Sequence, residues 1–94
     1  MYELRSEIRA AFSLDVHSIQ AVSGGDIANA FRIGTPEGPL FAKIMNGSRG
    51  AAVLASEARN LKAIRENGAL RTPEIYGLEP LSEGSCLLMA YVAP

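Results

Sequence analysis

The sequence has few of the residues that covalent cross-links and metal sites require. Of its 94 residues, one is a cysteine, Cys86, and one is a histidine, His17. One cysteine cannot form a disulfide within the chain, and one cysteine with one histidine cannot build a structural zinc site. The scarcity of cysteine favours a reducing compartment, so we expect a cytoplasmic protein.

Long apolar runs and an excess of charge of one sign are also missing. No run reaches the roughly 18 apolar residues of a membrane span, and the N-terminus, MYELRSEIRAAF, is charged from its third residue. This segment therefore does not read as a signal peptide. Nine basic and ten acidic residues give a formal net charge of −1, which does not favour nucleic acid or an anionic membrane as a partner.

The residues that are present predict an α+β fold. A hydrophobic content of 48% is that of a globular chain. The pattern predicts a five-stranded antiparallel sheet with one packed helix, over 51–66, and an additional N-terminal helix, over 2–12. The expected strands cover 17–23, 28–34, 39–45, 72–78 and 85–92. We expect NGSRG, residues 46–50, to be a breaker and EPLSEG, residues 79–84, to be a hairpin turn.

The chain stops at YVAP, directly after an apolar strand. A domain of this size is marginally stable by itself, because much of its surface stays in contact with water. We therefore expect residues 1–94 to be a piece of a longer protein, cut just after a strand. The alternative is a complete small domain whose final strand is its last element.

Two charged residues occupy positions where apolar residues are expected. Lys43 lies in the apolar strand FAKIM, and Glu57 falls within the helical stripe that contains Leu54, Ala58 and Leu61. Burying either charge alone would cost several kcal/mol, so pairing Lys43 with Glu57 is the economical arrangement. Because such a pair is seldom needed for stability, it suggests a functional role.

Simpler interpretations of these residues remain open. Lys43 can pack its stem and extend its amine into water, and Glu57 can lie solvated on the rim of the apolar stripe. Upstream, Gly24 and Gly25 link the first two strands and allow backbone N–H groups to approach a ligand closely. A Gly-Gly pair is also common in plain hairpin turns.

Taken together, these parts resemble the N-terminal lobe of the protein-kinase-like fold. The segments SGGDIANAFRI, FAKI, SEARNLKAIRENGALRTPEIYGL and LLMAYV are most similar to the fructosamine kinase (ketosamine 3-kinase) family. Aminoglycoside phosphotransferases and choline kinases are related to that family. The resemblance runs from about residue 19 to residue 92, and AIRENGALRTPEIYGL is its most telling part.

The resemblance implies an ATP-binding lobe with two catalytic residues. Lys43 would bind the α- and β-phosphates of ATP, and Glu57 would hold Lys43 in place. Backbone N–H groups of the glycine turn would cover the phosphates, and this turn comprises Gly24, Gly25, Asp26 and Ile27. The phosphate acceptor would be a ketosamine or another small molecule with a hydroxyl group.

The resemblance also implies an adenine slot at the end of the last strand. Met89 would be the gatekeeper, while the C=O of Ala90 and the N–H of Val92, on either side of Tyr91, would meet adenine. The chain has no G-x-G-x-x-G motif, and Ala90 stands where many relatives carry an acidic residue. The base aspartate and the Mg²⁺ ligands belong to the family's C-terminal lobe, so we expect no metal ligands here and no activity from these 94 residues alone.

Three hypotheses follow for the function. The first is the ATP-binding lobe of a small-molecule kinase, and the second is a non-catalytic nucleotide-binding lobe. The third is an interaction domain without a nucleotide site, which predicts no contact between Lys43 and Glu57.

Overall fold

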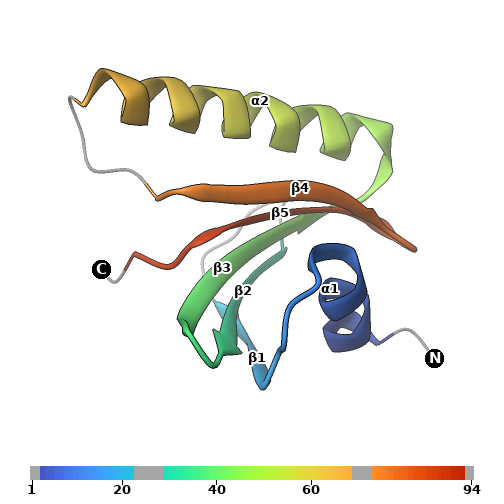
Figure 1. Cartoon of the computed structure of the whole chain (residues 1–94). Coiled ribbons are helices and arrows are strands. Elements are labelled where there is room, and N and C mark those ends of the chain that lie inside the picture. Colours follow the sequence, from blue (N-terminus) through green and yellow to red (C-terminus); the bar gives the residue numbers. More distant parts are fainter. Residues whose placement is uncertain (1–2, 23–28, 69–72, 93–94) are drawn as a thin grey trace.

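The computed structural model describes residues 3–22, 29–68 and 73–92. Within these residues it contains a five-stranded sheet and two helices (Figure 1). In chain order the elements are α1 (Leu4–Phe12), β1 (Ser18–Val22), β2 (Asn29–Thr35), β3 (Gly38–Met45), α2 (Gly47–Asn67), β4 (Ile75–Leu81) and β5 (Gly84–Ala90). Every strand pair is antiparallel, in the order β1-β2-β3-β5-β4, which confirms the predicted α+β fold.

The sheet carries one helix on each face (Figure 1). On one face, Ile8 of α1 packs in a buried cluster with side chains from β2, β3 and β5. On the other face, Leu54 and Ala58 of α2 pack against Leu87 and Met89 of β5. The interior strand β5 therefore contributes alternate residues to both clusters, as the pleat of a strand requires. This explains why its residues 86–89 are all buried.

The prediction that NGSRG interrupts the chain before the helix was wrong, because this segment forms the N-cap and first turn of α2. Asn46 is the N-cap residue and Gly50 is already buried in the helix. A side chain at Gly50 would bring its Cβ to within 2.7 Å of the Cβ of Met45. Glycine therefore lets α2 start directly after β3, and α2 begins at Gly47 rather than at Ala51.

The hairpin between the last two strands is tighter than the sequence suggested. β4 runs on through Glu79 and Pro80 to Leu81, so only Ser82 and Glu83 form the turn. Proline is tolerated at this point because β4 is an edge strand of the sheet. The last strand, β5, ends at Ala90, two residues before its predicted end at residue 92.

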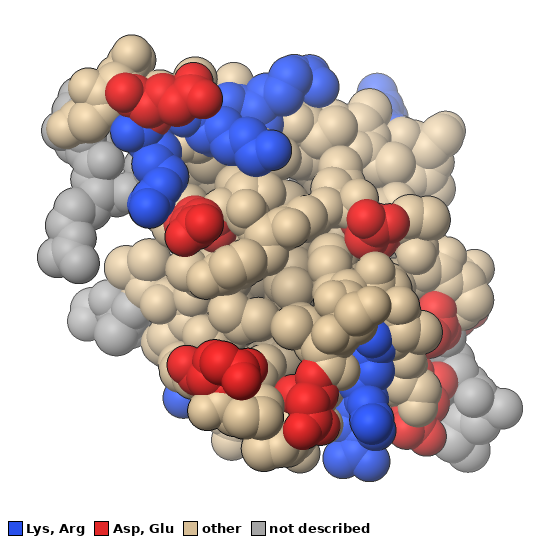
Figure 2. Space-filling view, viewed as in Figure 1, with Lys and Arg blue, Asp and Glu red and all other residues tan. Residues whose placement is uncertain are grey.

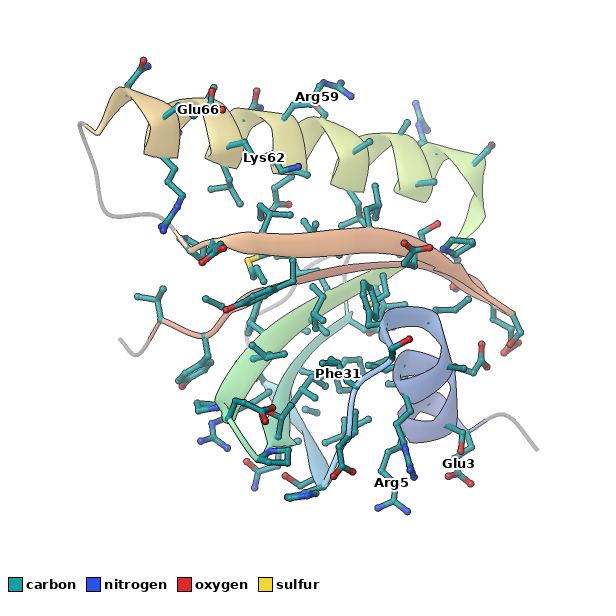
Figure 3. All side chains as sticks on the ribbon, viewed as in Figure 1. Glu3, Arg5, Phe31, Arg59, Lys62 and Glu66 are labelled. Atoms are coloured by element: carbon teal, nitrogen blue, oxygen red, sulfur yellow. The ribbon has the colours of Figure 1, made fainter. Side chains whose placement is uncertain are left out.

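The N-terminal helix α1 is attached to this hairpin by two short hydrogen bonds. The backbone N–H and the hydroxyl of Ser82 both donate to the carboxylate of Glu7, each at 2.6 Å. In Figure 3, Phe31 projects from β2 on the side where α1 lies, consistent with its packing against the same cluster as Ile8.

Neither helix in the described part of the chain is long and apolar enough to cross a membrane.

Candidate functional site

Lys43 projects from the middle of the sheet onto the face that α2 covers. Its strand β3 contributes Ala42 and Ile44 to the cluster beneath α1 and places Phe41 and Met45 beside the cluster beneath α2. Because neighbouring side chains alternate between the two faces, Lys43 faces α2 together with Phe41 and Met45. Its strand partners are Ala30 in β2 and Leu87 in β5.

Glu57 reaches the same position from α2. The helix buries Leu54 and Ala58 against the sheet, and Glu57 lies between them in helical position, facing the same side. Its side chain is 30% exposed, and that of Lys43 is 31% exposed. Neither charge is fully buried, so both remain accessible to water or to a ligand.

The two charges form a direct ion pair. Lys43 Nζ donates a hydrogen bond to Glu57 Oε2 at 2.7 Å. This confirms the predicted pairing and contradicts the expectation of an interaction domain in which these residues do not meet. A pair of this exposure contributes only about 0–1 kcal/mol to stability. The arrangement thus fixes a cation at a defined point on the sheet without adding much to the stability of the fold.

The chain's only other lysine provides a contrast with Lys43. Lys62 is exposed on α2, and Figure 3 shows it along the lower side of the helix, whereas Arg59 and Glu66 project from the upper side. Figure 2 shows basic side chains gathered along α2 at the top of the view. Lys43 does not belong to this solvated surface, because it projects from the sheet underneath the helix.

Met89, the predicted gatekeeper, is 4% exposed. It belongs to the cluster beneath α2 and pairs with Phe41 in the neighbouring strand. Leu87, two residues before it, is the strand partner of Lys43. Met89 therefore lies on the same face of the sheet as Lys43, two residues closer to the end of β5 than Leu87. Its role as gatekeeper stays a prediction.

The three residues predicted to meet adenine lie at the end of β5. Ala90 is the last residue of the strand, and its N–H donates to the C=O of Glu74 at 2.8 Å. Tyr91 and Val92 follow outside the sheet, and Val92 is 59% exposed. The backbone after Ala90 is therefore free of strand pairing, and its contact with adenine stays a prediction.

The glycine turn cannot be compared with its prediction. Gly24, Gly25, Asp26 and Ile27 lie outside the residues that the structure describes. The strands on either side of this segment end at Val22 and begin at Asn29. Ala30, the second residue of β2, pairs with Lys43. Lys43 therefore lies near the end of β2 that follows this segment.

A groove of about 520 Å³ lies away from the ion pair. Phe12 and Leu14, next to α1, form one side of it, and Leu40 and Leu88 come from the face of the sheet that α1 covers. Lys43 and Glu57 do not line this groove, whereas Ala90 and Tyr91 of the predicted adenine segment do. The chemistry of the ion pair therefore belongs to the opposite face of the sheet.

The remaining reactive groups of the described residues offer no second site. Cys86 is fully buried, and burial raises the pKa of its thiol to about 12. The thiol is therefore protonated at neutral pH and is a poor nucleophile. Across residues 3–22, 29–68 and 73–92 no group of three or more His, Cys, Asp or Glu side chains could hold a metal ion.

Sequence reasoning did not identify Arg32 as a site residue. Its guanidinium Cζ lies 5.3 Å from the centre of the Tyr91 ring, close to the predicted adenine segment. Phe31 and Ile33, its neighbours in β2, belong to the cluster on the α1 face. The alternation in AFRI therefore already placed Arg32 on the opposite face, the face of Lys43.

Comparison with known proteins identifies the family of the chain. A search of curated proteins found no matching relative. The family model described as fructosamine kinase matches residues 3–94, nearly the whole chain. The match includes the strand of Lys43, the helix of Glu57 and the end of β5. The chain therefore belongs to the fructosamine kinase family.

Proposed function

We propose that residues 1–94 are the N-terminal, ATP-binding lobe of a longer cytoplasmic kinase that phosphorylates a sugar hydroxyl of glycated amines. Family membership supports phosphoryl transfer in general. We add to this the proposal that ATP is the phosphate donor and a ketosamine the acceptor. The role of this chain as one lobe and the cytoplasmic location are also part of the proposal. The observation that carries it is the Lys43–Glu57 ion pair at 2.7 Å on a partly open face of the sheet.

The chemistry of the pair suits the binding of phosphate. An ammonium group has three N–H donors and no acceptor. Glu57 Oε2 takes one donor of Lys43, which leaves two donors for phosphate oxygens. Phosphoryl transfer depends mainly on positioning and on stabilising charge at the phosphates. A lysine that is held in place by a carboxylate supplies both requirements.

The surroundings of the pair suit the binding of adenine. Phe41, which is partly buried, and Met89, which is buried beside it, make the same face apolar between Lys43 and the end of β5. Beyond Ala90 the backbone is no longer paired in the sheet, so its polar groups can form hydrogen bonds with a base. In this proposal adenine lies against the end of β5, and the phosphates extend toward Lys43.

Mg²⁺ and the catalytic base would come from elsewhere in the protein. Among the described residues, Glu57 supplies the only carboxylate shown to contact Lys43, and it is engaged in the ion pair. We therefore assign no step of the reaction to a metal bound by the described residues. In this proposal the metal ligands and the base belong to a C-terminal lobe.

The proposal is tested by replacing Lys43 with methionine in the intact protein. Methionine keeps much of the volume of the stem but removes the positive charge. Loss of such a charge-stabilising contact costs about 2.7–4 kcal/mol of transition-state stabilisation, so turnover should fall roughly 10²–10³-fold. The measurement is the ATP-dependent phosphorylation of fructosyl-lysine, with thermal unfolding to verify that the variant is folded.

Lys62→Met is the matched control, because it removes the chain's other lysine from an exposed position on α2. It should leave turnover within about twofold of the wild type, as expected for an exposed side chain away from the site. An undiminished rate for Lys43→Met beside an active wild type would show that Lys43 is an ordinary strand residue and would refute the proposal.

A non-catalytic nucleotide-binding lobe is the second candidate. The buried cluster beside Lys43 is apolar, consisting of Leu54, Ala58, Leu87 and Met89. The Lys43–Glu57 pair above this apolar core could bind the phosphates of a nucleotide without transferring one of them. If the intact protein binds ATP through Lys43 but phosphorylates no ketosamine or other hydroxyl-bearing small molecule, this second candidate replaces the first.

A further inference from the structure

We propose that Arg32 is a positioning residue, which holds Tyr91 and thereby the backbone on both sides of it in the conformation that receives adenine. This inference rests on the proposed function, because the end of β5 is the adenine slot only if the chain binds ATP. It adds a residue from a different strand to the site. The contact between Arg32 and Tyr91 carries the inference.

The pattern of buried residues places Arg32 on the face of the ion pair. Phe31 and Ile33 pack in the cluster beneath α1, so Arg32 between them faces the other way. Its strand partner is Phe41, which packs beside the cluster beneath α2. Lys43 follows Phe41 by two residues and lies on the same face. Arg32 and Lys43 are therefore diagonal neighbours across β2 and β3.

The contact with Tyr91 reaches across the sheet. The Cζ of Arg32 lies 5.3 Å from the centre of the Tyr91 ring, within the distance of about 6 Å at which a cation is attracted to an aromatic face. β3 lies between β2, which carries Arg32, and β5, which Tyr91 follows. The contact therefore joins two parts of the chain that no backbone hydrogen bond connects directly.

Tyr91 needs such a restraint because it lies just beyond the sheet. The pairing of β5 with β3 ends at Ala90, opposite Leu40. Ala90 is also held by its N–H bond to Glu74, but Tyr91 and Val92 have no strand partner. Fixing the ring of Tyr91 limits the backbone rotations of the two peptide units that flank it. These units contain the C=O of Ala90 and the N–H of Val92, the groups predicted to meet adenine.

The guanidinium of Arg32 contacts the Tyr91 ring and not a carboxylate of the described residues. Within the described residues, no carboxylate forms an ion pair with Arg32, whereas Lys43 has Glu57 and Arg65 has Glu74. A guanidinium pairs well with a flat aromatic ring because it is planar and weakly hydrated. The same charge could instead contact the nucleotide directly, and the experiment below separates these two roles.

The test measures the affinity of the intact protein for a non-hydrolysable ATP analogue by calorimetry, together with KM and kcat. Arg32→Gln should raise the Kd of the analogue and the KM for ATP about five- to tenfold, the effect of losing one cation–π contact. The kcat should change less than about twofold, because Arg32 does not act on the transferred phosphate. Arg32→Lys should restore part of the affinity, since it retains a cation.

Variants of Tyr91 distinguish positioning from direct contact. Tyr91→Phe keeps the ring and should bind the analogue like the wild type, whereas Tyr91→Leu should weaken binding as much as Arg32→Gln. The double variant Arg32→Gln/Tyr91→Leu should be no weaker than either single variant, because the two residues form one interaction. Without nucleotide, Arg32→Gln should shift the NMR signals of the Tyr91 ring. Arg59→Gln, at an exposed position on α2, is the matched control and should change none of these values.

Two results would overturn the inference. If Arg32→Gln weakens binding and Tyr91→Leu does not, Arg32 contacts the nucleotide itself; if neither variant weakens binding, the contact has no role in the site. Lys43→Met in the same series separates this inference from the proposed function. An effect of Lys43→Met without an effect of Arg32→Gln refutes only the positioning role, whereas a protein that does not bind ATP at all refutes both.

Discussion

At the scale of single residues, Glu57 determines where the charge of Lys43 is placed. Replacing Glu57 by glutamine removes the negative charge but keeps an oxygen that can accept a hydrogen bond from Lys43 Nζ. The lysine should be held less firmly without being lost from the site. We expect Glu57→Gln to lower turnover by about tenfold, or ~1.4 kcal/mol, clearly less than Lys43→Met.

The comparison uses initial rates of ATP-dependent phosphorylation for the intact protein. Glu66→Gln, at an exposed position near the end of the same helix, is the control and should behave like the wild type. A loss equal to that of Lys43→Met would mean that Glu57 does more than hold the lysine. No loss at all would mean that Lys43 is positioned by other contacts.

The site residues differ in how far the sequence could reveal them. The pairing of Lys43 with Glu57 was predictable because the helical repeat places Glu57 between Leu54 and Leu61, and an unpaired charge there is unfavourable. The contact of Arg32 with Tyr91 was not predictable. This contact depends on the strand order, which places β3 between β2 and β5, and on the end of β5 at Ala90, before Tyr91.

At the scale of elements, the start of α2 depends on one close approach to β3. Alanine is usually better than glycine inside a helix by about 1 kcal/mol. At Gly50 we expect the opposite, because a Cβ would lie 2.7 Å from the Cβ of Met45 and 3.1 Å from its carbonyl carbon. Neither atom is at the end of a flexible chain, so the helix or strand would have to shift. Gly50→Ala should therefore lower the free energy of unfolding by about 1–3 kcal/mol.

Chemical denaturation of the wild type and the variant measures this difference. Ala52→Ser is the control, because it changes an exposed position of the same turn, and it should cost no more than about 0.5 kcal/mol. A variant Gly50→Ala that is as stable as the wild type, or more stable, would show that α2 can move away from Met45 at little cost.

The same region shows why element boundaries were harder to predict than the elements themselves. NGSRG has the composition of a turn, and local propensity alone favours a break. The close packing of Gly50 on Met45 comes from the tertiary structure, so the helix includes these residues. Pro80 likewise signals a break in an isolated sequence but is compatible with β4, because β4 is at the edge of the sheet.

At the scale of the whole molecule, the two faces of the sheet have different partners. The face beneath α1 carries apolar packing, the bonds of Ser82 to Glu7 and the groove beside Leu40 and Leu88. The face beneath α2 carries Lys43, Glu57 and Arg32, and it leads to the unpaired backbone after Ala90. The charged groups proposed to bind ATP thus lie on one face, and a second lobe would have to approach this face to complete the site.

This arrangement predicts how the isolated chain behaves beside the intact protein. The 94-residue chain holds the proposed contacts to adenine and to two phosphates, whereas the metal ligands and the base are proposed to lie in a C-terminal lobe. It should therefore show no phosphorylation of fructosyl-lysine, and it should bind an ATP analogue at least about tenfold more weakly than the intact protein, a difference of ~1.4 kcal/mol. Calorimetry and a turnover assay on both proteins measure these values. Lys43→Met in the isolated chain should remove the residual binding, because the lysine is the main contact to phosphate in this lobe. Turnover by the isolated chain would show that these residues contain a complete active site and that the proposed division into two lobes is wrong.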